Sequence, residues 1–298
     1  MEYFAMLLPG AGDPVAWAAQ RQDEGYTGVG IGDHIAPFGI AYPHLWVTLT
    51  SIAVSCPRLR VFSTFANNLF RSPVEFAQAA LSLAAVSGGR YDAGLGAGWA
   101  AAELESMGWS LPDGPTRARR YREAMHIVRA LLTERRCDFE GEHYRIHQPD
   151  IGVDSEHTPA LVAAVGGPWT IEHVSPYADV VEVMPVASSY RTGQYDRSAW
   201  TTGGADTCER MIELARKANP SARLCVNLPF SIGSDDRTRA SADRFANGPV
   251  AGMFGEATQV ADRLARLAAL GVSRFSLACP EPGGYAQLAE HLGLASQP

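Results

Sequence analysis

The sequence is short of the features that mark nucleic-acid-binding and membrane-embedded proteins. It has no run of basic residues and a formal net charge of −7, so we expect no nucleic-acid partner. No apolar stretch approaches the roughly 20 residues that a membrane-spanning helix needs, so we expect no membrane partner. The first residues lack the basic region of a signal peptide. Together these absences predict a cytoplasmic protein.

Cysteine is scarce and scattered. The five cysteines are Cys56, Cys137, Cys208, Cys225 and Cys279, without the spacing of a metal site, so we expect no bound metal. An odd, dispersed set fits reduced thiols, most of them acting as small buried apolar side chains.

What the sequence does contain is a regular alternation of strand and helix patterns. Eight strands are predicted, each followed by a helix, at residues 2–8, 28–32, 59–65, 91–95, 161–165, 179–183, 223–230 and 273–278. Such alternation indicates parallel strands joined by right-handed crossovers. Eight units without a linker predict an α/β protein, one (β/α)8 TIM barrel over residues 1–298, with an open doubly wound sheet as the alternative.

The repeat is interrupted by polar segments. We expect insertions after the fourth, sixth and seventh strands, and residues 185–206 and 231–255 show no clear period. Residues 139–144, within a polar stretch that follows the fourth long helix pattern, predict a small hairpin.

Functional side chains in such a barrel gather where the strands end. Asp33 and His34 follow the second strand, and histidine is the usual proton donor or acceptor near neutral pH. The alternative is an aspartate that caps a turn beside a surface histidine. Gly166 and Gly167 follow the fifth strand and suit either a phosphate cradle or a simple tight turn.

Three alternate glycines, Gly94, Gly96 and Gly98, end the fourth strand. They indicate either close packing or a flat ligand lying on bare main chain. Their spacing and place differ from the dinucleotide-binding fingerprint. Arg71, Arg191 and Arg197 are expected to be solvated surface charges, with contact to an anionic tail of the ligand as the alternative. Glu103 and Glu105 are expected at exposed or capping positions.

Taken in order, several motifs give the sequence a family resemblance over about residues 2 to 292. It resembles the luciferase-like monooxygenase superfamily, and within it the oxidoreductases that use coenzyme F-420, an 8-hydroxy-5-deazaflavin. The carrying motifs include Gly32-Asp33-His34, Arg71-Ser72-Pro73-Val74, Ser87-Gly88-Gly89-Arg90, Gly94-Leu95-Gly96-Ala97-Gly98-Trp99, Phe139-Glu140-Gly141 and Gly166-Gly167-Pro168.

The resemblance implies a barrel that holds its cofactor at the strand C-termini. It implies catalytic roles for Asp33 and His34 near the reactive carbon and a non-prolyl cis peptide near Thr64-Phe65. Cofactor contacts would come from Asp33, Thr64, Phe65, Ala66, Asn67, Gly96, Ala97, Gly98, Gly166 and Gly167, and pocket walls from Phe65 and Trp99. Relatives often pair, so a homodimer is expected on the same ground.

Two departures from that branch bear on the substrate. Trp99 stands where its sugar-phosphate dehydrogenases place a catalytic glutamate, and no lysine occurs from Met1 to Asp206 to meet a substrate phosphate. The prediction is therefore hydride transfer between coenzyme F-420 and an unidentified small organic substrate. The alternatives are a monooxygenase that uses reduced FMN and a non-catalytic barrel that binds a flavin-like ligand.

Overall fold

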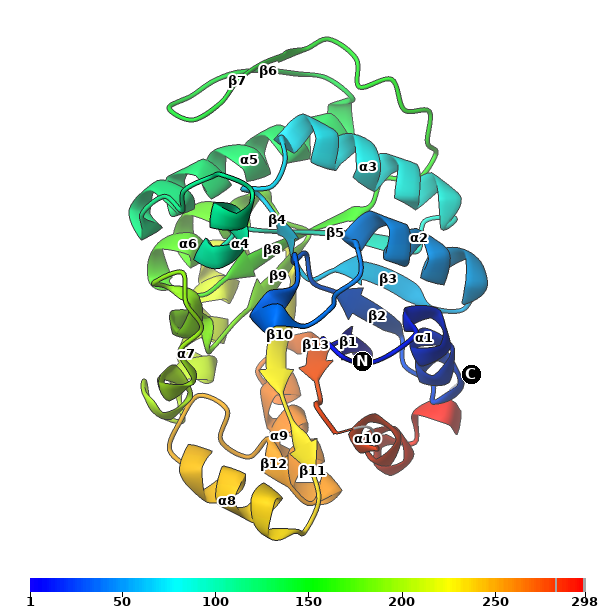
Figure 1. Ribbon diagram of the computed structural model, residues 1–298, viewed down its shortest axis with the longest axis vertical. Coiled ribbons are helices and arrows are strands. Elements are labelled where there is room, and N and C mark those ends of the chain that lie inside the picture. The colour runs from blue at the N-terminus through cyan, green and yellow to red at the C-terminus, as the bar shows by residue number, and fades with distance from the viewer. Residues whose placement is uncertain (282, 297–298) are drawn as a thin grey trace.

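The computed structural model describes residues 1–281 and 283–296, and a closed ring of parallel strands lies at its centre (Figure 1). The eight ring strands are β1 (Glu2–Leu7), β2 (Gly28–Ile31), β3 (Arg60–Ser63), β5 (Tyr91–Gly96), β8 (Ala160–Val165), β9 (Val180–Val183), β10 (Arg223–Pro229) and β13 (Val272–Ala278). Neighbours follow chain order, and the pairing of β1 with β13 closes the ring. The (β/α)8 barrel is confirmed, and the open-sheet alternative is wrong.

Helices cover the outside of this ring. They are α1 (Pro14–Asp23), α2 (Leu45–Ser55), α3 (Pro73–Val86), α5 (Gly114–Glu134), α6 (Pro168–Val174), α7 (Thr207–Ala218), α9 (Ala257–Ala269) and α10 (Gly284–Leu292). Side-chain caps fix several starts: the Ser72 hydroxyl accepts from the amides of Val74 and Glu75, with Pro73 at the first helical position. The only lysine of the sequence, Lys217, is exposed near the C-terminal end of α7 and pairs with Glu213.

The predicted hairpin is present as β6 (Cys137–Glu140) and β7 (Arg145–Gln148), which come between α5 and β8 in the chain. The hairpin projects from the outside of the barrel, beyond α5 (Figure 1). A carboxylate of α5 anchors its turn. Buried Glu123 accepts hydrogen bonds from the amides of Glu142, His143 and Tyr144 at 2.9 to 3.1 Å. Three amides on one carboxylate tie the turn to the barrel's outer layer.

The two segments without clear period turn out differently. Residues 185–206 are irregular apart from the 3₁₀ turns η3 (Ala187–Tyr190) and η4 (Arg197–Thr201). The expectation of irregular structure for 231–255 is wrong, since α8 (Asp236–Phe245) lies there between the short parallel strands β11 (Ser231–Ile232) and β12 (Phe254–Gly255). Asp235 caps α8 by accepting from Thr238, and few apolar residues mark the helix because it buries little besides Phe245.

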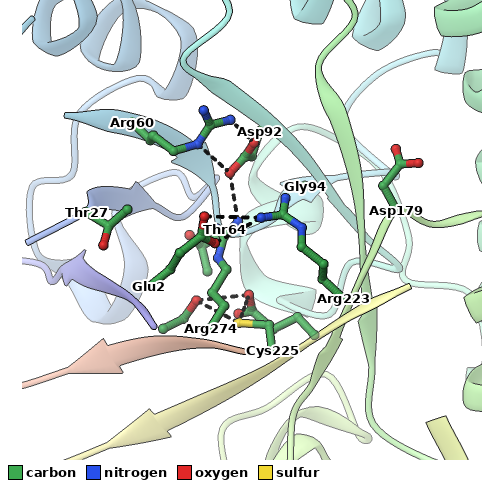
Figure 2. A network of polar contacts seen from close by, with 12 residues as sticks. Glu2, Thr27, Arg60, Thr64, Asp92, Gly94, Asp179, Arg223, Cys225 and Arg274 are labelled. Atoms are coloured by element: carbon green, nitrogen blue, oxygen red, sulfur yellow. Dashed lines mark hydrogen bonds and ion pairs between the residues drawn. The ribbon is translucent and has the colours of Figure 1, made fainter. Parts of the chain in front are cut away.

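Charge pairs lie inside the barrel at the end where the strands begin. Fully buried Arg274 donates to Asp92 over 2.7 Å, and Arg60 pairs with the same carboxylate (Figure 2). The Arg274 guanidinium also lies 3.6 Å from the ring centre of Phe4 and 4.4 Å from that of Phe62. Burial alone would raise the pKa of Asp92, but the two arginines lower it. Side chains therefore fill the barrel at this end.

The remaining global expectations concern cysteines, membranes and metals. All five cysteines are buried and unpaired, as expected. Within residues 1–281 and 283–296, no helix is long and apolar enough to cross a bilayer. The same residues contain no group of three or more histidine, cysteine or acidic side chains arranged to hold a metal ion.

Candidate active site

A cavity of about 1190 Å³ opens where the barrel strands end. Every predicted site residue lines it: Asp33, His34, Thr64, Phe65, Ala66, Asn67, Gly96, Ala97, Gly98, Trp99, Gly166 and Gly167. These residues are contributed by the exits of β2, β3, β5 and β8. The strand-end prediction therefore brings four separate segments of the chain to one hollow.

The exit of β3 is an irregular turn with the expected cis peptide between Thr64 and Phe65. The two-residue strand β4 (Ala66–Asn67) follows it and pairs with the end of β5. The buried Asp33 carboxylate accepts from the Asn67 amide over 2.8 Å and from both terminal nitrogens of Arg71. Asp33 thus ties the exit of β2 to the turn after β3.

Arg71 corrects a sequence-based expectation. It is not a solvated surface charge, because its side chain is 12% exposed and faces Asp33 across the cavity rim. The partner lies on a different strand exit, 38 positions away along the chain. Periodicity does not report such a contact, which depends on how the barrel closes.

The alternate glycines of β5 are explained by close packing. A Cβ at Gly94 would lie 2.0 Å from the Ser63 carbonyl oxygen, and one at Gly98 would lie 2.2 Å from the Asn67 side-chain oxygen. Gly98 also has a φ of +80°, which favours glycine. At Gly96 a Cβ would meet that of Phe65 at 3.0 Å. These glycines let the turn after β3 lie directly against β5, and Gly96 and Gly98 still border the cavity.

His34 has a buried acidic partner that sequence reasoning missed. The Glu103 carboxylate, 7% exposed, lies 2.9 and 3.2 Å from the Nδ1 atom of His34 and accepts from the Ile35 amide. The exposed or capping role expected for Glu103 is wrong. Its place in the first turn of α4 (Ala101–Ser106) puts it at the exit of β5, facing the exit of β2. The only sequence signal was its short distance from the glycine-rich exit.

The geometry gives His34 one free nitrogen. A carboxylate at Nδ1 favours the tautomer that carries the proton there, which leaves Nε2 to exchange a proton or a hydrogen bond with a ligand. The Trp99 ring lies 5.5 Å from the imidazole, and Tyr42 packs on it at 6.2 Å. The His34–Glu103 pair thus lies beside Asp33 as a polar edge in an otherwise aromatic wall.

Three further aromatic residues form that wall with Trp99. The ring centres of Trp99 and Tyr190 are 4.8 Å apart, those of Tyr190 and Tyr195 are 5.5 Å apart, and those of Tyr195 and Phe38 are 5.7 Å apart. Burial raises the pKa of Tyr190, so its hydroxyl stays protonated. Of these four aromatic residues, only Trp99 is predicted from the sequence as a pocket wall, because the other three lie in loops without a clear period.

The glycines at the exit of β8 have a hydrogen-bond partner within their own turn. The amides of Gly166 and Gly167 both point at the Thr170 hydroxyl, each at 3.3 Å. A Cβ at Gly167 would meet nothing within 4 Å, so its backbone faces open space. Arg191 and Arg197 line the cavity mouth and are exposed, as expected.

Most of the chain matches one known protein family. Residues 8–246 match the luciferase-like monooxygenase family. The chain belongs to that family.

Several curated relatives of this luciferase-like chain share one activity name. It is 30% identical over 168 residues to an F-420-dependent glucose-6-phosphate dehydrogenase of Kineococcus radiotolerans, a match that covers 55% of this chain and 49% of the relative. A second, from Intrasporangium calvum, is 32% identical over 162 residues, covering 52% and 48%. The chain thus spans about half the length of the curated relatives it matches.

Two solved structures share the whole fold of this luciferase-like chain at low sequence identity. An F-420-dependent secondary alcohol dehydrogenase in complex with an F-420–acetone adduct superposes with a TM-score of 0.77 and 17% identity over 99% of both chains. The monooxygenase RslO1 from Streptomyces bottropensis gives 0.76 and 17% over the full length of both. At such identities the similarity establishes the barrel and leaves the choice of cofactor to the residues of the site.

Proposed function

We propose that this luciferase-like protein is an oxidoreductase that transfers hydride between coenzyme F-420 and a small organic substrate. The observation that carries the proposal is the His34 imidazole, held at Nδ1 by buried Glu103 on the edge of a cavity beside Asp33. The curated relatives, whose names specify F-420, and the secondary alcohol dehydrogenase fold support the same cofactor.

The cavity fits a flat tricyclic ring with a polar tail. Its volume of about 1190 Å³ exceeds the usual range for small-ligand pockets, about 300–1,000 Å³. Thr64, Phe65, Ala66, Asn67, Gly96, Ala97 and Gly98 would border the ring and its side chain. Gly166 and Gly167 would approach the phosphate, with Gly167 open to the cavity. When bound, a deazaflavin supplies two-electron hydride chemistry, and the protein supplies position and electrostatics.

The residues of this chain would divide the remaining work. Asp33 holds the turn after β3 in shape and so orients the surface under the ring. His34 would move a proton at Nε2 between the substrate oxygen and the site, with Glu103 holding the ring at Nδ1. Trp99 and Phe65 would wall the substrate side and exclude water. A tryptophan at position 99 and the absence of lysine from the cavity argue against a sugar phosphate as substrate.

A second candidate function is supported by one of the solved structures. RslO1, a monooxygenase, superposes almost as well as the F-420-dependent alcohol dehydrogenase, so the alternative is a monooxygenase that uses reduced FMN. His34 with its buried partner Glu103 favours the F-420-dependent function, because the imidazole could exchange a proton with an alcohol or carbonyl substrate. A barrel that binds such a ligand without turnover is the third possibility.

Separate titrations with oxidised F-420 and with FMN test the choice. We expect saturable F-420 binding and at most weak FMN binding, followed by hydride exchange with alcohols or carbonyl compounds. Submicromolar FMN binding without F-420 binding would reject the proposal. F-420 binding with no exchange to any substrate would favour the non-catalytic barrel.

Replacing His34 tests the proposed proton transfer. H34A should lower kcat by about 10²–10⁴-fold, the usual contribution of general acid–base catalysis, and change the F-420 dissociation constant much less. Unchanged turnover would reject the role assigned to His34.

A further inference from the structure

The cavity floor on the β1, β10 and β13 side is almost entirely apolar. Among the described residues, these strands and their exits contribute Met6, Leu7, Pro229, Ala278 and Pro280 to the lining, with Leu8 and Pro9 beyond them. Asn227 of β10 is the polar side chain in this set. A ligand fragment lying here meets an apolar surface that carries one amide.

A buried carboxylate below the floor fixes that amide. Glu182 of β9 is completely buried, and its Oε1 atom accepts from the Asn227 Nδ2 group over 2.9 Å. Its Oε2 atom accepts from the Ser276 hydroxyl at 2.9 Å and from the Cys225 thiol at 3.1 Å. Three donors converge on two oxygens, the arrangement that a carboxylate requires.

The surroundings keep this donor set in place. Burial raises the pKa of Cys225, and the charge of Glu182 raises it further, so the thiol keeps its proton and donates. Arg274 lies in the register position next to Cys225 and supplies the compensating positive charge inside the barrel (Figure 2).

The orientation of Asn227 follows from this chemistry. A carboxylate offers no hydrogen to the amide oxygen, so the Asn227 nitrogen must face Glu182. The second amide atom, Oδ1, is then directed to the other side, where the half-buried side chain borders the cavity. The floor therefore presents the amide oxygen of Asn227 as a hydrogen-bond acceptor at this point.

We propose that Asn227 is a specificity-determining residue, and that its amide oxygen accepts a hydrogen bond from the one O–H or N–H donor of an otherwise apolar ligand fragment. Glu182 acts through it as a positioning residue. The inference rests on the proposed function for its choice of ligands: the donor is either the hydroxyl of a secondary alcohol substrate or a ring N–H of the deazaflavin.

The experiment measures three dissociation constants for the full-length protein. They are those of oxidised F-420 and, on the F-420 complex, of cyclohexanol and its ketone cyclohexanone, which differ in the donor. N227A should weaken binding of the donor-bearing ligand about tenfold, the effect of one buried hydrogen bond. A change in F-420 affinity assigns the donor to the cofactor, and a change confined to cyclohexanol assigns it to the substrate.

The second variant, E182Q, tests the positioning role. A neutral glutamine can donate to the Asn227 oxygen and so allow the amide to turn over. If the substrate carries the donor, the ratio of cyclohexanol to cyclohexanone affinity should fall in E182Q; if the cofactor carries it, F-420 affinity should fall. A merely structural role would change neither of these and would appear only as lower stability.

The matched control removes another buried asparagine. Asn219 donates to the carbonyl oxygens of Ser175 and Ala178, away from the cavity, so N219A should cost stability and leave all three dissociation constants unchanged. Unchanged F-420 affinity in N227A would overturn the inference if cyclohexanol affinity is also unchanged, or if the wild-type complex itself binds no cyclohexanol. Failure of the wild-type chain to bind F-420 would instead reject the proposed function, and N227A would then be compared with wild type using FMN and cyclohexanol.

Discussion

At the scale of single residues, the site depends on contacts between side chains that are far apart in sequence. His34 and Glu103 are separated by 69 positions, and Asp33 and Arg71 by 38. Each pair joins two strand exits, so each fixes the distance between loops as well as the orientation of a side chain. Without Glu103, the imidazole of His34 would lose the carboxylate that holds its Nδ1 atom and selects its tautomer.

Substituting Glu103 should therefore reduce turnover without much change in cofactor affinity. E103Q keeps the shape of the side chain but loses the charge that favours the Nδ1-protonated ring, and we expect kcat to fall by about 10–100-fold. E105Q, an exposed neighbour on the same helix, is the control and should behave as wild type. Equal kcat values for the two variants would contradict the role of Glu103.

Sequence reasoning located the residues of the site better than their partners. Asp33, His34 and the glycines were found because strand ends in a barrel converge, which is a property of the fold class. Glu103 and Arg71 were assigned to the surface, because single-chain patterns show which face of a helix is polar but do not show that another loop covers it. Asn227 was not singled out, since its partner Glu182 lies inside a strand that reads as simply buried.

At the scale of elements, the turn after β3 and the glycines of β5 form one unit. The turn occupies the space that side chains at positions 94, 96 and 98 would take, and Asp33 holds its far end. The sequence left two explanations open for the glycines, and a choice between them needed the position of a neighbouring loop.

Adding a methyl group at Gly94 should disturb this unit. A Cβ there would lie 2.0 Å from the Ser63 carbonyl oxygen, so G94A should lower the free energy of unfolding by about 1–3 kcal/mol, as overpacking does, and weaken ligand binding through the displaced turn. G114A is the control: its Cβ would meet only Arg117 at 3.9 Å, at the start of α5. Urea denaturation of both variants decides, and equal midpoints would refute the packing explanation.

At the scale of the whole molecule, strand and helix order predicted the barrel because alternation of this length has few other solutions. The helix α8 was not predicted, because it is mostly polar and lies outside the regular βα repeat. The burial of Arg274 and Asp92 was not predicted either, since a charged residue in a strand pattern ordinarily indicates a solvent-facing position.

Buried thiols and phenols make the molecule sensitive to alkali. Burial raises the pKa of Cys208 and of Cys279 to about 12, from 9.0, and that of Tyr42 to about 12, from 10.0. Between pH 9 and 12 the unfolded chain loses these protons before the folded one, so stability falls as pH rises, by up to about 1.4 kcal/mol per pH unit for each group.

Urea midpoints at pH 8, 9, 10 and 11 measure this dependence. We expect little change from pH 8 to 9 and a progressive fall above it, with a shallower slope in C208A, which lacks one of the titrating groups. A flat profile up to pH 11 would show that these protons are released as easily in the folded state.

The solitary lysine has a practical consequence for the measurement of cofactor affinities. Lys217 lies exposed on α7, outside the set of residues that line the cavity, and is the only lysine of the sequence. An amine-reactive tether attached at Lys217 would couple the protein to a sensor surface in few orientations. The mouth of the barrel would remain accessible, so cofactor affinities could be compared across variants on one immobilised geometry.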